Sequence, residues 1–73
     1  MTAPEHTVEA CPTGGFFVRV RGEIAGSISE DAEYAGLWSA WDQRDKFVCH
    51  TASQREAAAF LAARFVAEEE SQP

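Results

Sequence analysis

The feature that most constrains the fold is a single amphipathic helix expected near the end of the chain. Ser53 and Glu56 have the spacing of a capping box, in which a hydroxyl and a carboxylate each satisfy an unpaired amide at a helix start. Residues 57–67 contain no Gly or Pro and are nearly all strong helix formers. Their apolar side chains recur at helical spacing: Ala57, Phe60, Leu61 and Phe65. This stripe needs a second layer to cover it.

A β-hairpin is predicted upstream of the helix by side chains that alternate with a period of two. The alternating apolar positions are Phe16, Val18, Val20, Ile24 and Ile28. Gly22 provides a tight connection between the two strands. The expected cross-strand pairs are Val20 with Ile24, Val18 with Gly26, and Phe16 with Ile28. This register places the large apolar groups on one face, where the helix stripe can cover them.

Two further strands are predicted after the hairpin, over residues 34–41 and 46–50. Residues 42–45 read as a reverse turn, because their side chains readily cap their own backbone. The predicted fold class is therefore α+β, a three- to four-stranded antiparallel β-meander with one C-terminal α-helix packed on one face. This single ββββα domain is expected to span residues 15–67.

The two ends of the chain carry weaker signals. Residues 1–14 hold Pro4, Pro12 and Gly14 without helical or strand periodicity, so we expect a flexible arm. The alternative is a short edge strand that contains Val8, Ala10 and Cys11 and ends before Pro12. Residues 68–73 begin with three glutamates, which oppose the helix macrodipole, and we expect this acidic tail to fray.

Composition and charge limit the function classes. A chain of 73 residues with 45% apolar side chains allows one domain with a small core and little room for a catalytic cavity. The sequence has no apolar run of about 18 residues and no signal-peptide pattern, so we expect a soluble, cytoplasmic protein without membrane contact. The net charge of −6 disfavours binding to phosphates.

Four residues are candidates for metal binding or catalysis: His6, Cys11, Cys49 and His50. These side chains are a complete zinc set by type, but adjacent residues such as Cys49 and His50 point to opposite faces of a strand. The same objection applies to a cysteine nucleophile beside its base. A disulfide between Cys11 and Cys49 is the alternative to a buried, reduced Cys49. We predict no enzyme activity, no metal and no cofactor.

Protein binding is the use that the remaining features favour. The aromatic side chains cannot all lie beneath one short helix, and residues 23–42 carry five acidic side chains and no basic one. The candidate interaction surface comprises Phe17, Arg19, Arg21, Glu30, Asp31, Glu33, Trp38 and Trp41. We predict a small non-enzymatic protein-interaction module with a protein partner, and homodimerisation would supply the stability that a small core lacks.

The order of elements over residues 15–67 resembles that of small uncharacterised accessory proteins of actinobacteria and their phages. The resemblance implies no established activity, but it favours a phage-type accessory protein. The acidic residues between Glu23 and Asp42 lead to the hypothesis that such a protein occupies a basic site on a host protein. The sheet with a C-terminal helix also resembles the arm-site-binding domains of phage integrases, and residues 53–58 resemble the last helix of double-stranded-RNA-binding domains. These two likenesses imply the alternative function, nucleic-acid binding by Arg19 and Arg21 on the sheet face.

Overall fold

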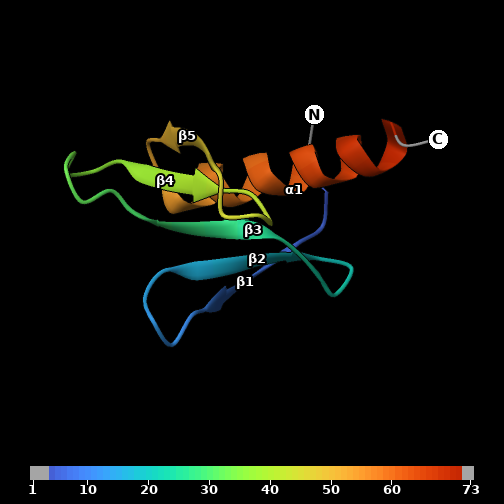
Figure 1. Ribbon diagram of the computed structural model, residues 1–73, viewed down its shortest axis with the longest axis horizontal. Helices are drawn as coiled ribbons and strands as arrows, with labels where there is room; N and C mark the ends of the chain where they lie inside the picture. Colours follow the sequence, from blue (N-terminus) through green and yellow to red (C-terminus); the bar gives the residue numbers. More distant parts are fainter. Residues whose placement is uncertain (1–3, 72–73) are drawn as a thin grey trace.

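A five-stranded antiparallel sheet and one helix make up the fold in the computed structural model, which describes residues 4–71 (Figure 1). The strands lie in sequence order, so each one pairs with the next along the chain. The elements are β1 (Thr7–Ala10), β2 (Phe16–Val20), β3 (Glu23–Glu30), β4 (Trp38–Trp41), β5 (Phe47–Thr51) and α1 (Gln54–Ser71). The α+β class is confirmed, and the sheet has one strand more than the four expected at most.

The additional strand, β1, lies within the segment expected to be a flexible arm. Val8 pairs with Val18 and Ala10 pairs with Phe16, so β1 adds an edge strand beside β2. The turn after β1 is closed by a hydrogen bond from Cys11 N to the Gly15 carbonyl oxygen, 2.9 Å long. Val8 and Ala10 thus form the edge pairing that was the alternative to a flexible arm, whereas Cys11 lies beyond the end of the strand. The first three residues of the predicted arm lie outside the described residues.

The β2–β3 hairpin has a two-residue turn where a loop of about three was expected. Arg21 and Gly22 have φ angles of 55° and 82°, as a type I′ turn requires. The pairs Phe16–Ile28 and Val18–Gly26 are confirmed. The pair Val20–Ile24 is wrong, because Val20 pairs with Glu23 and a β-bulge follows. The bulge leaves Ala25 as the extra residue and buries it, whereas Ile24 is exposed.

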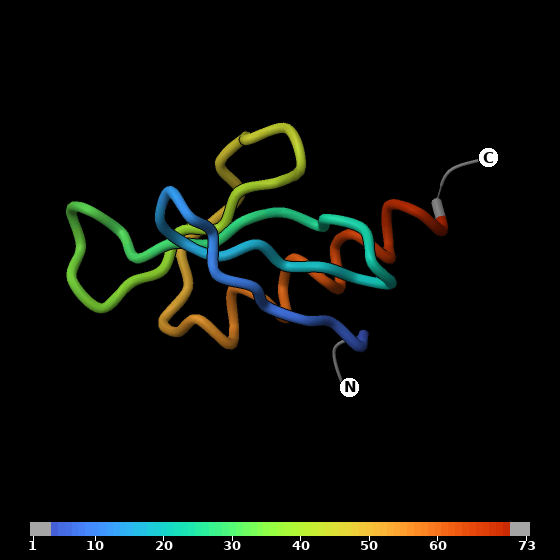
Figure 2. Tube along the Cα trace, turned by 90° about the horizontal axis from the view of Figure 1, so that it is seen from below, coloured from blue at the N-terminus to red at the C-terminus, as the bar shows by residue number. Residues whose placement is uncertain are grey.

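The β4 strand begins at Trp38, four residues later than predicted. Asp31 explains the difference, because its carboxylate accepts the backbone N–H groups of Glu33 and Tyr34 and curls the chain into a connection. A second bulge lies between β4 and β5, where Ala40 pairs with Cys49 and Trp41 pairs with Phe47. Figure 2 shows the β3–β4 connection (green) and the β4–β5 turn (yellow) leaving the sheet in different directions.

The helix begins as predicted. Ser53 Oγ accepts a hydrogen bond of 3.1 Å from the backbone N–H of Glu56, which is the capping contact expected from the sequence. The helix continues to Ser71 and so includes part of the tail expected to fray. Ion pairs from Glu69 to Arg21 and from Glu68 to Arg64 support this last stretch. Residues 72–73 lie outside the described residues. Within residues 4–71, no helix combines the length and apolar content needed to span a membrane.

The core forms where α1 lies on the sheet. Its buried apolar residues are Val18, Val20, Ala25, Ile28, Ala40, Ala57, Ala58, Leu61 and Ala62. Gly26 permits the contact, because a Cβ atom there would collide with the Trp41 carbonyl oxygen and lie 3.0 Å from Leu61 Cδ1. The missing side chain at Gly26 therefore leaves a space in the sheet, and Leu61 of the helix fills it.

The predicted apolar stripe of the helix is wrong at Phe60. Leu61 is 1% exposed and Phe65 packs partly against the core, as expected, but Phe60 is 44% exposed. The helix face that meets the sheet is the one with Ala57, Ala58 and Ala62, because alanines let the two layers approach closely. Phe60 lies about a quarter-turn away from Leu61, on the side of the helix that carries Arg64.

This packing predicts opposite outcomes for two neighbouring truncations. Leu61→Ala should lower the free energy of unfolding by about 2 to 5 kcal/mol, because it leaves a cavity at the centre of the core. Phe60→Ala should cost less than about 1 kcal/mol, because the ring is already exposed to water. Urea denaturation followed by circular dichroism measures both. A larger loss for Phe60→Ala than for Leu61→Ala would contradict this description of the core.

Candidate interaction surface on the open sheet face

Four rings line the sheet face that α1 leaves open, and we call them the aromatic row: Tyr34, His50, Phe47 and Trp41. Their consecutive ring centroids are 6.0 Å, 4.9 Å and 5.4 Å apart. The β4–β5 register explains their common face, since Ser39 pairs with His50 and Trp41 pairs with Phe47. Ala40, between these two β4 residues, points to the opposite face and is buried in the core.

Asp31 holds the first ring of the row in place. Its Oδ2 accepts the N–H groups of Glu33 and Tyr34 at 2.9 and 2.7 Å, and its Oδ1 accepts Ser39 Oγ–H at 2.9 Å. His50 Nε2 lies 2.9 Å from the same Oδ1 and donates to it, because an ionised carboxylate only accepts. We call this set the Asp31 network. It attaches the β3–β4 connection to β4 and β5, and so places Tyr34 against His50.

The electrostatics of the network follow from its donors. The backbone N–H of Tyr34, followed by the hydroxyl of Ser39, lowers the pKa of Asp31 from 3.8 to about 2. Asp31 is therefore ionised near neutral pH. A serine, a histidine and an aspartate also meet in hydrolases, but there the histidine lies between the other two. Here Asp31 lies between them, and Ser39 is 4% exposed and donates its proton to Asp31. The histidine therefore contacts the carboxylate and not the serine, unlike in those hydrolases.

The arginines expected on the surface are both paired with carboxylates. Arg19 lies on the open face of β2, where its Nε donates to Glu9 Oε2 at 2.8 Å. Arg21 lies in the β2–β3 turn and pairs with Glu69 of the helix at 3.4 Å. Both arginines border one pocket beside His6, but each guanidinium there is engaged by a carboxylate. Phe17, half-buried on β2, shares the open face with Arg19, because its cross-strand partner Glu9 is the residue that pairs with Arg19.

The two tryptophans lie on opposite faces of the sheet. Trp41 belongs to the aromatic row, as expected of a surface residue. Trp38 corrects the prediction, because it packs against the core beside Phe16, with ring centroids 6.1 Å apart. The acidic residues Glu30 and Glu33 lie exposed at and beyond the end of β3. Of the residues expected on the interaction surface, the structure thus brings two together: Asp31 in the Asp31 network and Trp41 in the adjoining aromatic row.

Three members of the aromatic row were missed from the sequence: Tyr34, Phe47 and His50. In a regular strand, residues three apart such as Phe47 and His50 point to opposite faces. The bulge at Val48 shifts the alternation by one residue and brings both rings to the same face. Tyr34 reaches them only because Asp31 folds the connection back. The local signal available in the sequence was Asp31 itself. An aspartate often accepts the backbone N–H groups two and three residues later, here those of Glu33 and Tyr34, and so bends the chain.

The cysteines are unpaired in the structure. Cys49 is half-buried against the core, so it is less buried than expected, and Cys11 Sγ lies 3.1 Å from Thr13 Oγ1. No disulfide bond joins Cys11 and Cys49. In the described part of the chain, no three potential metal-ligating side chains of His, Cys, Asp or Glu come together.

Comparison with known proteins adds no further constraint. Neither protein-family models, nor curated proteins, nor solved structures give a match to this chain.

The lowered pKa of Asp31 predicts that the fold loses stability in acid. Its pKa in the fold lies below its ordinary value, so the ionised form stabilises the protein above about pH 4, and this contribution is lost as the pH falls through about 2. Asp31→Asn should be less stable than the parent at neutral pH and should lose less stability between pH 4 and pH 2. Urea midpoints over this range measure the effect. Asp45→Asn, in another turn, is the control and should keep the parent profile; an unchanged profile for Asp31→Asn would contradict the role of the network.

Proposed function

We propose that this chain is a non-enzymatic interaction domain that binds a basic segment of another protein through the aromatic row. The observation that carries the proposal is the exposure of adjacent rings on a sheet face that no helix or strand within residues 4–71 covers. Tyr34 is 56% exposed and Phe47 is 49% exposed, and both contact His50. Adjacent exposed rings in a small folded domain are typical of binding surfaces, because aromatic side chains supply large contact areas at low entropic cost.

The charge beside the row supports a basic partner. Glu30 ends β3 and Glu33 lies in the β3–β4 connection, and within the described residues neither has an ion-pair partner. An arginine or lysine of the partner can lie over an aromatic face while its charge approaches these carboxylates. The net charge of −6 also draws a basic partner toward the chain before contact.

The biological setting of the proposal comes from the sequence resemblance. A phage-type accessory protein that occupies a basic site on a host protein fits an acidic, aromatic surface on a small rigid scaffold. Nucleic-acid binding by Arg19 and Arg21 has less support, because each guanidinium is engaged by a carboxylate. A homodimer formed through the same face is the second form of the proposal, since it would bury the rings without another protein.

Co-purification at low salt tests the proposal. The double variant Tyr34→Ala/Phe47→Ala should lose a protein partner that the parent chain retains, and raising the salt concentration should release that partner from the parent. Phe60→Ala is the matched control, because Phe60 is exposed to a similar degree but lies on the helix. The proposal is wrong if the parent retains no protein at low salt, or if Phe60→Ala removes the same protein.

Sedimentation of the pure chain distinguishes the two forms of the proposal. If a second copy is the partner, the chain at micromolar concentration should sediment with about twice its own mass. Phe47→Glu should then return it to the mass of one chain, because a dimer interface would bury the added carboxylate. A parent chain that sediments as a monomer rules out the homodimer and leaves the foreign protein as the partner.

A further inference from the structure

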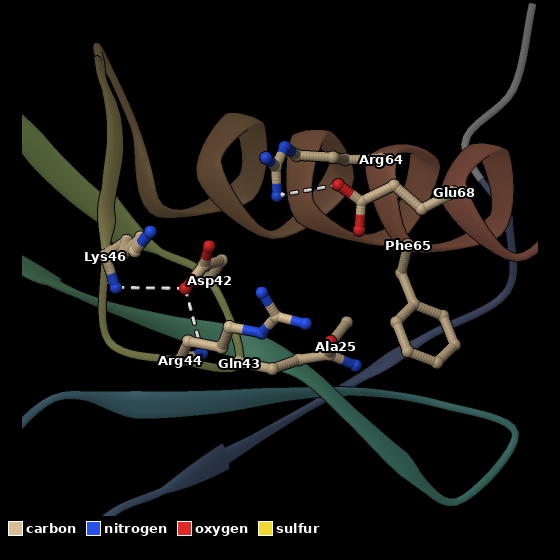
Figure 3. A pocket seen from close by; sticks show the side chains of 8 residues that line it. All are labelled: Ala25, Asp42, Gln43, Arg44, Lys46, Arg64, Phe65 and Glu68. Atoms are coloured by element: carbon tan, nitrogen blue, oxygen red, sulfur yellow. Dashed lines mark hydrogen bonds and ion pairs between the residues drawn. The ribbon is translucent and has the colours of Figure 1, made fainter.

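A polar cavity lies between α1 and the β4–β5 turn, away from the aromatic row. It encloses about 480 Å³ and is lined by side chains of the turn on one side and of the helix on the other (Figure 3). The lining includes Arg44, Lys46 and Arg64, which are three of the six basic residues of the chain. In a chain of net charge −6, this concentration of positive charge at one place needs an explanation.

The two acidic residues of the cavity are occupied by local contacts. Asp42 Oδ1 accepts the backbone N–H groups of Arg44 and Lys46 at 2.8 and 2.9 Å, and the Lys46 contact is the main cause of the lowered pKa of Asp42. Glu68 pairs with Arg64 at 3.3 Å, one helical turn away. Within residues 4–71, no carboxylate forms an ion pair with the side chain of Arg44 or Lys46. The two cations of the turn thus border the cavity outside ion-pair distance of any described carboxylate, although Asp42 attracts Lys46 through space.

The turn that presents these cations is held rigidly. Asp42 N donates to the Lys46 carbonyl oxygen at 2.9 Å, and Asp45 N donates to the Asp42 carbonyl oxygen at 3.1 Å. Gln43 Nε2 reaches across to the carbonyl oxygen of Ile24 on β3, 2.9 Å away. A site whose backbone is fixed before the ligand arrives loses less entropy on binding.

We propose that this cavity binds a small organic anion that carries a phosphate or carboxylate group next to an apolar ring or chain. The guanidinium of Arg44 and the ammonium of Lys46 would hold the oxyanion, for which they are well suited. Arg64 adds charge from the helix side, and its exposed pair with Glu68 is of a kind that exchanges readily. Phe65 lies at the end of the cavity in Figure 3 and offers a surface for the apolar part.

Nuclear magnetic resonance titration of the ¹⁵N-labelled full chain with phenyl phosphate, at constant ionic strength, tests the site. We expect shifts of the backbone signals of residues 42–46 and 64–65, with a dissociation constant of about 1 mM or tighter. Inorganic phosphate should bind more weakly because it lacks the ring, and phenol should not bind because it lacks the charge. A titration in which phenol shifts the same signals equally would overturn the role of the cations.

Variants separate a specific site from general attraction of anions. Arg44→Ala/Lys46→Ala should weaken phenyl phosphate binding by about tenfold or more, because it removes both unpaired cations. The turn should persist in this variant, since Asp42 bonds the backbone and not the two side chains. Arg55→Ala, an exposed arginine of α1 outside the cavity, is the matched control and should bind like the parent. Equal losses in the two variants, or no shifts in the parent, would overturn the proposal.

Discussion

The contact between Leu61 and Gly26 is the interaction on which the rest of the structure depends. A side chain at position 26 would collide with the neighbouring strand and with the leucine, so glycine leaves the space into which the helix packs. The alanines beside Leu61 then bring the helix backbone close to the sheet. In a chain with so small a core, a tight contact of this kind contributes more than the number of apolar residues suggests.

Because one helix covers one face, the other face of the sheet is left to water. The sheet places small or polar side chains there on β3 and β4, and aromatic rings on β4 and β5. A bulge at Val48 turns Phe47 toward the face that already carries His50, and so assembles a continuous row of rings. The candidate binding surface is thus a consequence of an irregularity in the sheet, and not of its regular alternation.

Two aspartates hold the connections that flank the proposed sites. Asp31 bonds two backbone amides of its own connection together with side chains of β4 and β5, and Asp42 bonds two amides of the β4–β5 turn. In both cases the carboxylate accepts backbone N–H groups and shapes the chain. It does not form an ion pair with a neighbouring arginine or lysine side chain. Glu33 beside the aromatic row, and Arg44 and Lys46 at the cavity, are therefore presented on loops that hydrogen bonds hold, as ligand binding favours.

The spacing of residues in the sequence determined the elements whose signals are local. The capping serine begins the helix, the alternation around Val18 makes the hairpin, and Gly26 faces Val18 as its position indicates. Tertiary structure alone decided that residues 7–10 form an edge strand and that Phe60 stays exposed. It also decided which tryptophan is covered by the helix. The physical reason is that bulges and edge pairing depend on contacts between distant strands, and one inserted residue reverses the face of every side chain beyond it.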